Sequence, residues 1–269
     1  MDMIAFIGGG NMASAIIGGL RKNGRDAASI VVVDPGDAQR AKVEGDFGVR
    51  TLAAADASLA QASLVVWAVK PQFFSAAAAP CEAHVKNALQ LSVMAGIRSD
   101  AIARASGSER VVRAMPNTPA LIGRGISGLY ARPSVGAAER AQVEAVLAPT
   151  GQTVWVDREE DLDAVTALSG SGPAYVFYFV EAMIAAAQQM GLSAAQGKQL
   201  ALATFAGATE LAATSEEPPQ VLRERVTSKG GTTYAALTSL EASGVKAAFI
   251  TALRAAQQRA RELGDEFGG

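Results

Sequence analysis

The most constraining feature of this sequence is that the spacing of its apolar residues changes part-way along the chain. Up to about Asp157, short runs rich in β-branched residues alternate with alanine-rich stretches of helical pattern. The short runs are apolar on both faces, as the strands of a parallel sheet must be when helices cover both sides. The sequence therefore predicts an α/β domain. Its expected strands lie within the runs MIAFIG, SIVVVD, GVRTL, LVVWAV, LQLSVMAG, RVVRAMP, GISGLYA and TVWVD.

The rest of the chain, from Asp161 to Glu266, shows only helical patterning. We therefore expect an α/β domain over residues 1–160 and an all-α domain over residues 161–269. A long apolar run in the second domain, PAYVFYFVEAMIAAAQQ, contains a glutamate and is shorter than the roughly twenty residues that cross a bilayer. It predicts a buried helix. The helices are expected to break at SGSGP, MGLS, EEPP, KGG and SGV.

The charge balance limits the classes of partner. The net charge is -2, and charged residues make up only 19% of the chain and are mixed in sign. This argues against a nucleic acid or a membrane surface as the partner, so binding of small molecules is the expectation. An alanine-rich helical half typically covers its apolar surface by pairing with a second copy, which predicts a homodimer. A self-contained bundle is the alternative.

Cysteine and histidine are too few for disulfide or metal chemistry. The single cysteine, Cys81, cannot form an internal disulfide. Together with the single histidine, His84, it makes no cluster with metal-ligand spacing, and His84 is expected at the surface. The opening MDMIAFIGGG is a strand followed by glycines, without the basic and apolar regions of a signal peptide. The protein is expected to be cytoplasmic and to hold no metal.

The first expected strand leads directly into a glycine-rich turn, IAFIGGGNMASAIIGGL, that opens a helix. Gly8 permits the tight turn, Gly10 lets the backbone approach a pyrophosphate, and Ala13 allows close helix packing. The helix N-terminus favours the anion. A purely structural glycine turn is the alternative, but Asp34 ends the second strand, where a carboxylate accepts hydrogen bonds from a ribose diol. The pattern predicts a Rossmann-type dinucleotide-binding domain.

Asp34 also bears on the choice of cofactor. Its carboxylate should repel a 2′-phosphate, and the next base is Arg40, so electrostatics favour or at least tolerate NAD. The loops AVKPQ and MAG are also expected over the cofactor, because open α/β sheets bind ligands at the carboxyl ends of their strands. Lys70 is the one cation in the first loop, and a solvated lysine is the alternative. The expected cofactor-binding residues are Gly8, Gly10, Asn11, Met12, Asp34, Ala68, Val69, Lys70, Pro71, Ala95 and Gly96.

Five segments, in order along most of the chain, resemble those of pyrroline-5-carboxylate reductases: IGGGNMA, AVKPQ, MPNTP, LSGSGPAY and VTSKGGTTYAAL. The last two are specific to that family, whereas the first is shared by many dehydrogenases. The resemblance implies a Rossmann domain followed by an all-helical domain that interlocks with a partner subunit's. It also implies reduction of 1-pyrroline-5-carboxylate to L-proline, the last step of proline synthesis, with NADPH or NADH. Rings of dimers are known in the family.

The resemblance also implies a substrate site at the helix start within VTSKGGTTYAAL. Peptide N–H groups and hydroxyls converge there, which suits a carboxylate and needs no acid or base. An ordinary side-chain-capped helix is the alternative. Lys229 departs from a proline that is common in the family, and the acidic position near the ligand amine corresponds to Glu216, with Glu217 as a competing candidate. The implied substrate-binding residues are Glu216, Ser228, Gly230, Gly231, Thr232 and Thr233.

The expected catalytic residues are Thr233 and Ser228. A cyclic imine can carry its own proton near neutral pH, so the enzyme mainly aligns the reactants, and Thr233 is the candidate for a hydrogen bond to the ring nitrogen. A hydroxyacid dehydrogenase is the first alternative, but it would need a catalytic lysine on the helix after the Rossmann domain, and Ser169 to Gln189 contains none. The second alternative, a non-catalytic nucleotide sensor, would not need a carboxylate pocket.

Overall fold

The computed structural model describes residues 2–267 of the chain. By internal packing it divides into two compact units. The first, which we name the sheet unit, extends to Gly172 and also takes in the C-terminal stretch from Ala255. The second, the helical unit, is Pro173–Arg254. The expected division near residue 160 concerns functional domains and stays a prediction.

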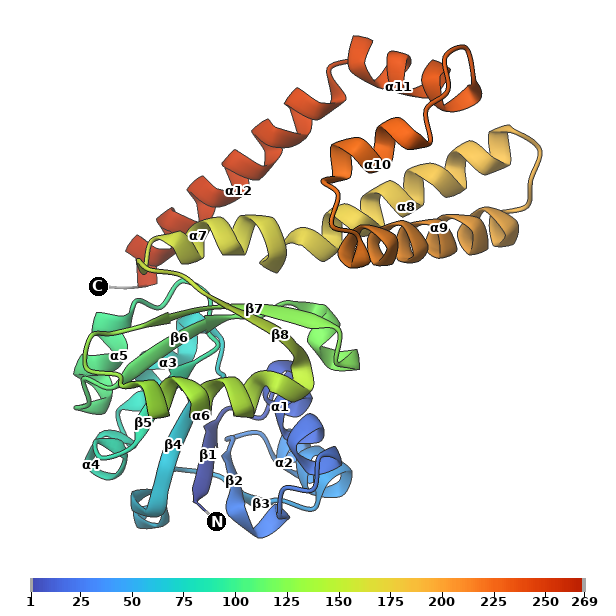
Figure 1. Ribbon diagram of the computed structural model, residues 1–269. Coiled ribbons are helices and arrows are strands. Elements are labelled where there is room, and N and C mark those ends of the chain that lie inside the picture. Colours follow the sequence, from blue (N-terminus) through green and yellow to red (C-terminus); the bar gives the residue numbers. More distant parts are fainter. Residues whose placement is uncertain (1, 268–269) are drawn as a thin grey trace. The chain divides into compact units, whose positions relative to one another are not determined.

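The sheet unit is built on one eight-stranded sheet with the order β3-β2-β1-β4-β5-β6-β7-β8 (Figure 1). Every run that was expected to be a strand overlaps one, so the α/β prediction is confirmed. The strands are β1 (Met3–Ile7), β2 (Ile30–Val33), β3 (Arg50–Leu52), β4 (Ala62–Trp67), β5 (Leu89–Ser92), β6 (Val111–Met115), β7 (Gly125–Ala131) and β8 (Gly151–Trp155).

One pair of strands differs from the expected parallel sheet. β7 runs antiparallel to β6, whereas the other neighbouring strands pair in parallel. The chain between Met115 and Gly125 contains only the 3₁₀ turn Thr118–Ile122. A parallel connection needs a crossover of about a dozen or more residues, usually a helix. The short link therefore turns the chain back, and the all-parallel expectation is wrong at this pair.

Helices cover both faces of the sheet, as the apolar runs require. Successive residues of β1 point to opposite sides: Phe6 packs in a cluster with Ile16 of α1, and Ile7 packs in a second cluster with Ile102 of α5. The first cluster also includes residues of α2 and α6, and the second includes residues of α3 and α4. The helices are α1 (Asn11–Lys22), α2 (Asp37–Phe47), α3 (Phe74–Ala78), α4 (Glu82–Val85), α5 (Ser99–Ser106), α6 (Ala137–Leu147) and α7 (Asp161–Val165).

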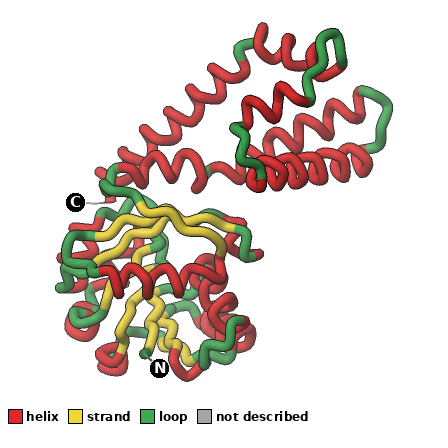
Figure 2. The backbone as a smooth tube through the Cα atoms, in the orientation of Figure 1, coloured by secondary structure: helices red, strands yellow, loops and turns green. Residues whose placement is uncertain are grey.

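After β8 the described chain contains helices and no strands (Figure 2). The breaks between helices fall at the predicted places, and Pro173 lies in the first turn of its helix, where its missing N–H costs nothing. A π-helical turn, Thr166–Gly170, comes before that helix. The remaining helices are α8 (Gly172–Gln189), α9 (Ala194–Thr214), α10 (Pro219–Arg225), α11 (Thr232–Ala242) and α12 (Val245–Phe267).

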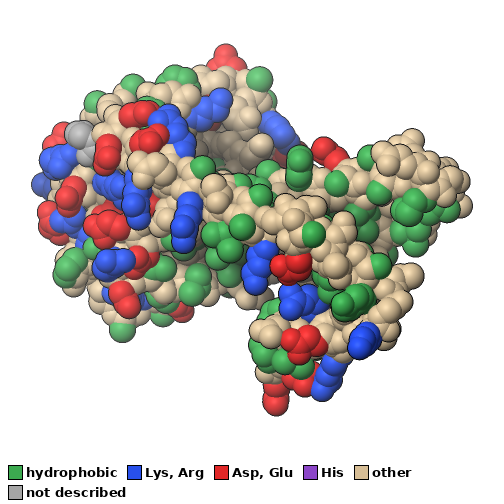
Figure 3. Space-filling view, turned by 90° about the horizontal axis from the view of Figure 1, so that it is seen from above, with side chains coloured by type: hydrophobic (Ala, Val, Ile, Leu, Met, Phe, Trp, Pro, Cys, Tyr) green, Lys and Arg blue, Asp and Glu red, His purple; other side chains and the backbone are tan. Residues whose placement is uncertain are grey.

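Helix α8 was expected to be buried, and in the single chain it is not. Val176, Phe177 and Tyr178 are exposed, Tyr178 by 70%. Figure 3 shows hydrophobic side chains at the surface of the helical part. An apolar helix is expected to be covered, but its sequence does not show whether the same chain covers it. The prediction of a buried α8 is therefore wrong for a single copy. None of the helices in residues 2–267 has the length and apolarity to span a bilayer.

Candidate active site

The glycine-rich turn after β1 is fixed between two neighbouring strands. The Gly8 N–H donates to the carbonyl of Val33 (2.8 Å), and the Ala68 N–H donates to the carbonyl of Ile7 (2.8 Å). Gly8 has φ +97°, and an added Cβ would lie 2.7 Å from the Ala68 carbonyl oxygen. Both the left-handed backbone and the close approach require glycine here.

The start of α1 is open to a ligand. Gly10 is the N-cap residue, and no side chain caps the helix. A Cβ placed on Gly10 would meet no atom within 4 Å, so the space in front of the first turn is free. Asn11 and Met12 lie in this turn, and Ala13 is fully buried against the sheet. Uncapped N–H groups and the positive end of the helix dipole suit a pyrophosphate.

Asp34, directly after β2, is held by two main-chain donors. The Gly9 N–H donates to its Oδ2 and the Gly36 N–H donates to its Oδ1, each at 2.9 Å. A carboxylate offers about four lone-pair sites. Two of them remain for a ligand, which suits the two hydroxyls of a ribose.

These groups surround a cavity of about 640 Å³. Of the predicted cofactor residues, Gly8, Gly10, Asp34 and Ala68–Lys70 line it. Pro71 begins the 3₁₀ turn after Lys70 and is not among the lining residues. Sequence reasoning missed part of the wall, although the position of Ala53–Ala55 directly after a strand was an available signal. The missed lining residues include Pro35, Gly36, Gln39, Ala53, Ala54, Ala55, Phe73, Ala76, Ala77 and Pro80.

The loop with Ala95 and Gly96 does not line this cavity. Gly96 has φ +75°, and a Cβ there would lie 3.2 Å from the Leu263 carbonyl oxygen on α12. The last turns of α12 belong to the sheet unit, and Ala260 and Gly264 are buried there. The C-terminal helix therefore supports this predicted cofactor loop, a contact that the helical pattern does not reveal.

Gly264→Leu is expected to disturb the loop through Arg98. A Cβ at Gly264 would lie 2.5 Å from the Arg98 guanidinium, which pairs with Asp163 at 3.3 Å. We expect KM for the reduced cofactor to rise roughly three- to tenfold with kcat within about twofold, because a weakened support costs on the order of 1 kcal/mol. Steady-state kinetics measures this split. Gly45→Leu is the control, an exposed helical glycine with open space around it, and equal kinetics for the two variants would contradict the supporting role.

A buried ion pair lies close to this contact in the same unit. Arg113 on β6 is only 5% exposed, and its Nη1 donates to Glu159 Oε1 at 2.8 Å. Ser99 donates to Glu159 with its N–H (2.6 Å) and its hydroxyl (2.5 Å). Burial lowers the pKa of Arg113 and the charge of Glu159 opposes that shift, so the pair is held as an ion pair. It joins β6, α5 and the segment before α7, and we assign it a structural role.

Two family-like loops are tied together by Asn117. Its Nδ2 donates to the carbonyl of Ser169 (3.2 Å), and its Oδ1 accepts from the Ile126 N–H (3.0 Å). The MPNTP loop is thereby joined to the π-helical turn. Because both ends of the amide have main-chain partners, Asn117 acts here as a structural link.

In the helical unit, α11 begins without a side-chain cap. Its N-cap residue is Gly231, so the alternative of a serine- or threonine-capped helix does not hold. Gly230 has φ +76°, and the Gly231 N–H donates to the Ser228 carbonyl at 3.0 Å. A Cβ on Gly231 would lie 2.7 Å from Ser228 Oγ, so this hydroxyl lies against the turn. First-turn N–H groups without a cap need a partner, which water or an anionic ligand supplies.

The two acidic candidates differ in their contacts. Glu217 Oε1 pairs with Arg225 of α10 at 2.5 Å, whereas Glu216 is exposed. Thr233 is half-buried in the first turn of α11, and Thr232 is exposed. Glu217 is thus occupied within its own unit. The roles given to Glu216 and Thr233 stay predictions.

No group of three or more His, Cys, Asp and Glu in residues 2–267 has the arrangement of a metal site. Cys81 is fully buried, and burial raises the pKa of its thiol to about 11, so it remains protonated at neutral pH. His84 is half-buried on α4 and does not line the cavity. Neither residue contributes to the candidate site.

Known proteins resemble both parts of the chain. The family model for pyrroline-5-carboxylate reductase dimerisation matches residues 159–263, and a model described as NADP oxidoreductase coenzyme F420-dependent matches residues 3–96. A pyrroline-5-carboxylate reductase of Pseudomonas aeruginosa is 45% identical over 267 residues, covering 98% of both chains. The chain belongs to the pyrroline-5-carboxylate reductase family. The resemblance predicted from the five segments is therefore confirmed.

Solved structures of the family agree in fold. A pyrroline-5-carboxylate reductase of Coxiella burnetii has a TM-score of 0.91 at 36% identity, with 97% of this chain and 98% of that chain covered. The Plasmodium falciparum enzyme, solved with NADP bound, has a TM-score of 0.86 at 28% identity over the same shares. The expected α/β domain followed by a helical dimerisation domain is confirmed. The matched dimerisation model includes α8, whose apolar side chains are exposed in one copy.

Proposed function

We propose that this chain reduces 1-pyrroline-5-carboxylate to L-proline with NADPH or NADH. The observation that carries the proposal is the uncapped start of α11, with Gly230 in the left-handed region and Gly231 as N-cap. A helix start of this kind binds a carboxylate through main-chain donors.

The residues of the sheet unit fit a dinucleotide. Gly8 and Gly10 allow the backbone to approach the pyrophosphate, and the first turn of α1, with Asn11 and Met12, offers uncapped N–H groups. Asp34 retains acceptor sites for ribose hydroxyls. When bound, the reduced nicotinamide supplies the hydride.

In the helical unit, the segment Ser228–Thr233 would hold the substrate carboxylate. The main-chain N–H groups at Thr232 and Thr233 would donate to it, and the Ser228 hydroxyl would orient it. The hydroxyl of Thr233 would hydrogen-bond the ring nitrogen, directly or through water, and so hold the imine in its protonated form. The carboxylate of Glu216 would further stabilise the positive charge on the ring nitrogen.

Thr233→Val is expected to lower kcat/KM for the imine by roughly 10- to 100-fold, because a hydrogen bond to a charged group contributes about 1.5–3 kcal/mol. The variant keeps the shape of the side chain and removes the hydroxyl. Thr238→Val is the matched control, since Thr238 lies on the same helix and its hydroxyl donates to the Tyr234 carbonyl at 2.8 Å. If kcat and KM of Thr233→Val both stayed near wild type, the role of this hydroxyl would be wrong.

Oxidation of the reduced cofactor, followed at its absorbance band, tests the function itself. The substrates are pyrroline-5-carboxylate, a set of 2-keto acids, and buffer alone. Turnover with the imine supports the proposal. Turnover with keto acids only would indicate a hydroxyacid dehydrogenase, although α8 has no lysine that could act as the catalytic base. Cofactor binding without turnover of the imine or of any keto acid would indicate a non-catalytic nucleotide sensor.

The organisation of the protein follows from the same proposal. Residues 1–160 would form the dinucleotide-binding domain, and residues 161–269 the substrate-binding and dimerisation domain. We propose that the homodimer acts in the cytoplasm and that dimers associate further into a ring. The exposed apolar side chains of α8 support pairing of chains.

A further inference from the structure

We infer that the nucleotide site of this chain selects NADH over NADPH, and that Asp34 is the residue that excludes the 2′-phosphate. The inference rests on the proposed use of a reduced dinucleotide and deepens it by choosing between the two forms. It is argued from the hydrogen bonds of Asp34, from the engagement of the nearest base, and from the composition of the cavity wall.

Asp34 cannot turn away from the cavity without losing two hydrogen bonds. Its two oxygens accept from the N–H groups of Gly9 and Gly36, at 2.9 Å each, so the carboxylate is fixed at the end of β2. A Cβ on Gly36 would lie 3.2 Å from Oδ1, so the turn closes tightly around the side chain. The same geometry leaves acceptor sites for ribose hydroxyls and places a fixed negative charge where a 2′-phosphate would have to lie.

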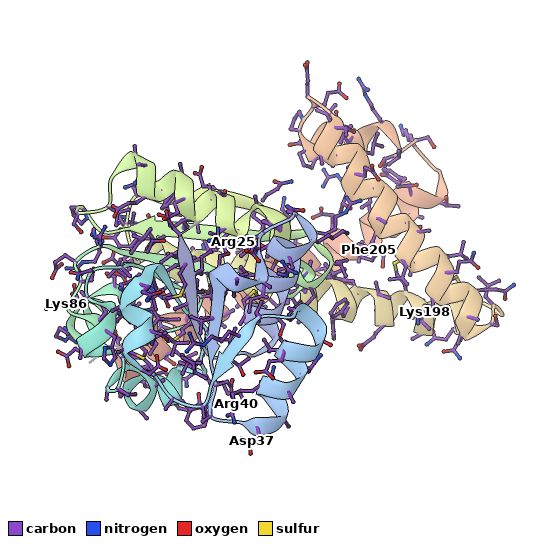
Figure 4. All side chains as sticks on the ribbon, turned by 90° about the horizontal axis from the view of Figure 1, so that it is seen from below. Arg25, Asp37, Arg40, Lys86, Lys198 and Phe205 are labelled. Carbon is purple, nitrogen blue, oxygen red and sulfur yellow. The ribbon has the colours of Figure 1, made fainter. Side chains whose placement is uncertain are left out.

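The nearest base does not compensate this charge. The guanidinium of Arg40 donates to the main-chain carbonyl of Asp34 at 2.8 Å and pairs with the Asp37 carboxylate. Figure 4 shows Arg40 and Asp37 together at the start of α2. Arg40 is not among the residues that line the cavity. Its guanidinium charge is thus already paired with a carboxylate, and Asp37 adds a second negative charge beside the place of a 2′-phosphate.

The remaining wall offers few donors to a phosphate. Ala53, Ala54 and Ala55, which follow β3, have no polar side-chain atoms, and the amide of Gln39 donates to the Gly9 carbonyl. Lys70 is the one cation among the described lining residues. It follows β4, on the loop expected to pass over the cofactor, where it can serve the pyrophosphate that both cofactors share. The site thus provides acceptors for a diol and little that would neutralise an additional dianion.

Equilibrium binding of NADH and NADPH to the full-length protein, measured by calorimetry without imine, tests the inference. We expect the wild type to bind NADH at least about tenfold more tightly than NADPH, because a fixed carboxylate repels a like charge placed against it. Asp34→Ser should reverse or abolish this ratio by strengthening NADPH binding. Asp46→Ser is the control, because it removes the same charge from the exposed end of α2, outside the cavity, and should leave the ratio unchanged.

Any of three outcomes would overturn the inference. The first is a wild-type protein that binds NADPH as tightly as NADH, and the second is an Asp34→Ser variant with an unchanged ratio. The third is a Lys70→Met variant that weakens NADPH binding more than NADH binding, which would place the 2′-phosphate beside Lys70. Equal weakening of both by Lys70→Met agrees with a pyrophosphate contact. Because binding is measured without imine, the ratio can hold even if the assigned turnover fails, and turnover can be present even if the ratio does not hold.

Discussion

Gly8→Ala is expected to weaken binding of the reduced cofactor by at least about 100-fold. The added methyl group would lie 2.7 Å from the Ala68 carbonyl oxygen and 2.9 Å from Val69 Cγ1. The carbonyl belongs to the backbone after β4 and cannot rotate away. The turn must therefore move, and with it the first turn of α1 that faces the pyrophosphate. A displacement of this kind removes several main-chain hydrogen bonds to the ligand, each contributing roughly 1.5–3 kcal/mol when the acceptor is charged.

The control for this variant separates steric contact from backbone strain. Gly24 has φ +88°, close to the φ of Gly8, but a Cβ there would meet no atom within 4 Å. Gly24→Ala should cost only the left-handed penalty, roughly 1–2 kcal/mol of stability, and leave cofactor affinity unchanged. Calorimetric titration with NADH measures the affinities, and thermal unfolding measures the stabilities. Wild-type affinity in Gly8→Ala would show that the turn does not hold the pyrophosphate.

Glu159→Ala is expected to destabilise the protein by roughly 3–5 kcal/mol, because it leaves the buried charge of Arg113 without its partner. Among residues 2–267, Arg113 Nε has no hydrogen-bond partner, and Glu159 is the carboxylate that pairs with the guanidinium. The substitution also removes the acceptor of both donors of Ser99. The expected fall in Tm is on the order of 10 °C, measured at one fixed protein concentration.

Glu160→Ala is the matched control, since it removes the neighbouring carboxylate from an exposed position. It should change Tm by no more than about 2 °C. The double variant Arg113→Met with Glu159→Leu should recover much of the stability, because an apolar pair of similar volume avoids the buried charge. Equal losses in Glu159→Ala and Glu160→Ala would mean that the ion pair contributes nothing measurable.

Strands and helix breaks were predictable because they depend on local patterns. Strands of this kind and the breaks at glycine or proline are determined by residues adjacent in the sequence. Each predicted strand and break is present. The direction of β7 cannot be predicted from its own residues, because the short connection from β6 determines it. Nor does the sequence of α8 tell whether its apolar face is covered by the same chain or by a second copy. That difference lies in tertiary and quaternary packing.

In the candidate site, residues with distinctive chemistry and the loop after β4 could be predicted, whereas much of the remaining wall could not. Asp34 and the glycines of the first turn were predicted because only those residue types suit a diol and a close backbone approach. Ala53–Ala55 were missed because an alanine wall carries no chemical signal of its own. The pairing of Arg113 with Glu159 and the contact of Gly264 with Arg98 were missed because they join residues far apart in the sequence.

The most direct test of the proposed function is a crystal structure of the assembled protein with L-proline and cofactor. The central claim is that main-chain N–H groups at the start of α11 receive the carboxylate of a small ring. We predict density for proline with its carboxylate oxygens within hydrogen-bond distance of the N–H groups at Thr232 and Thr233. Proline bound at any other place, with the first turn of α11 facing only solvent, would contradict the claim.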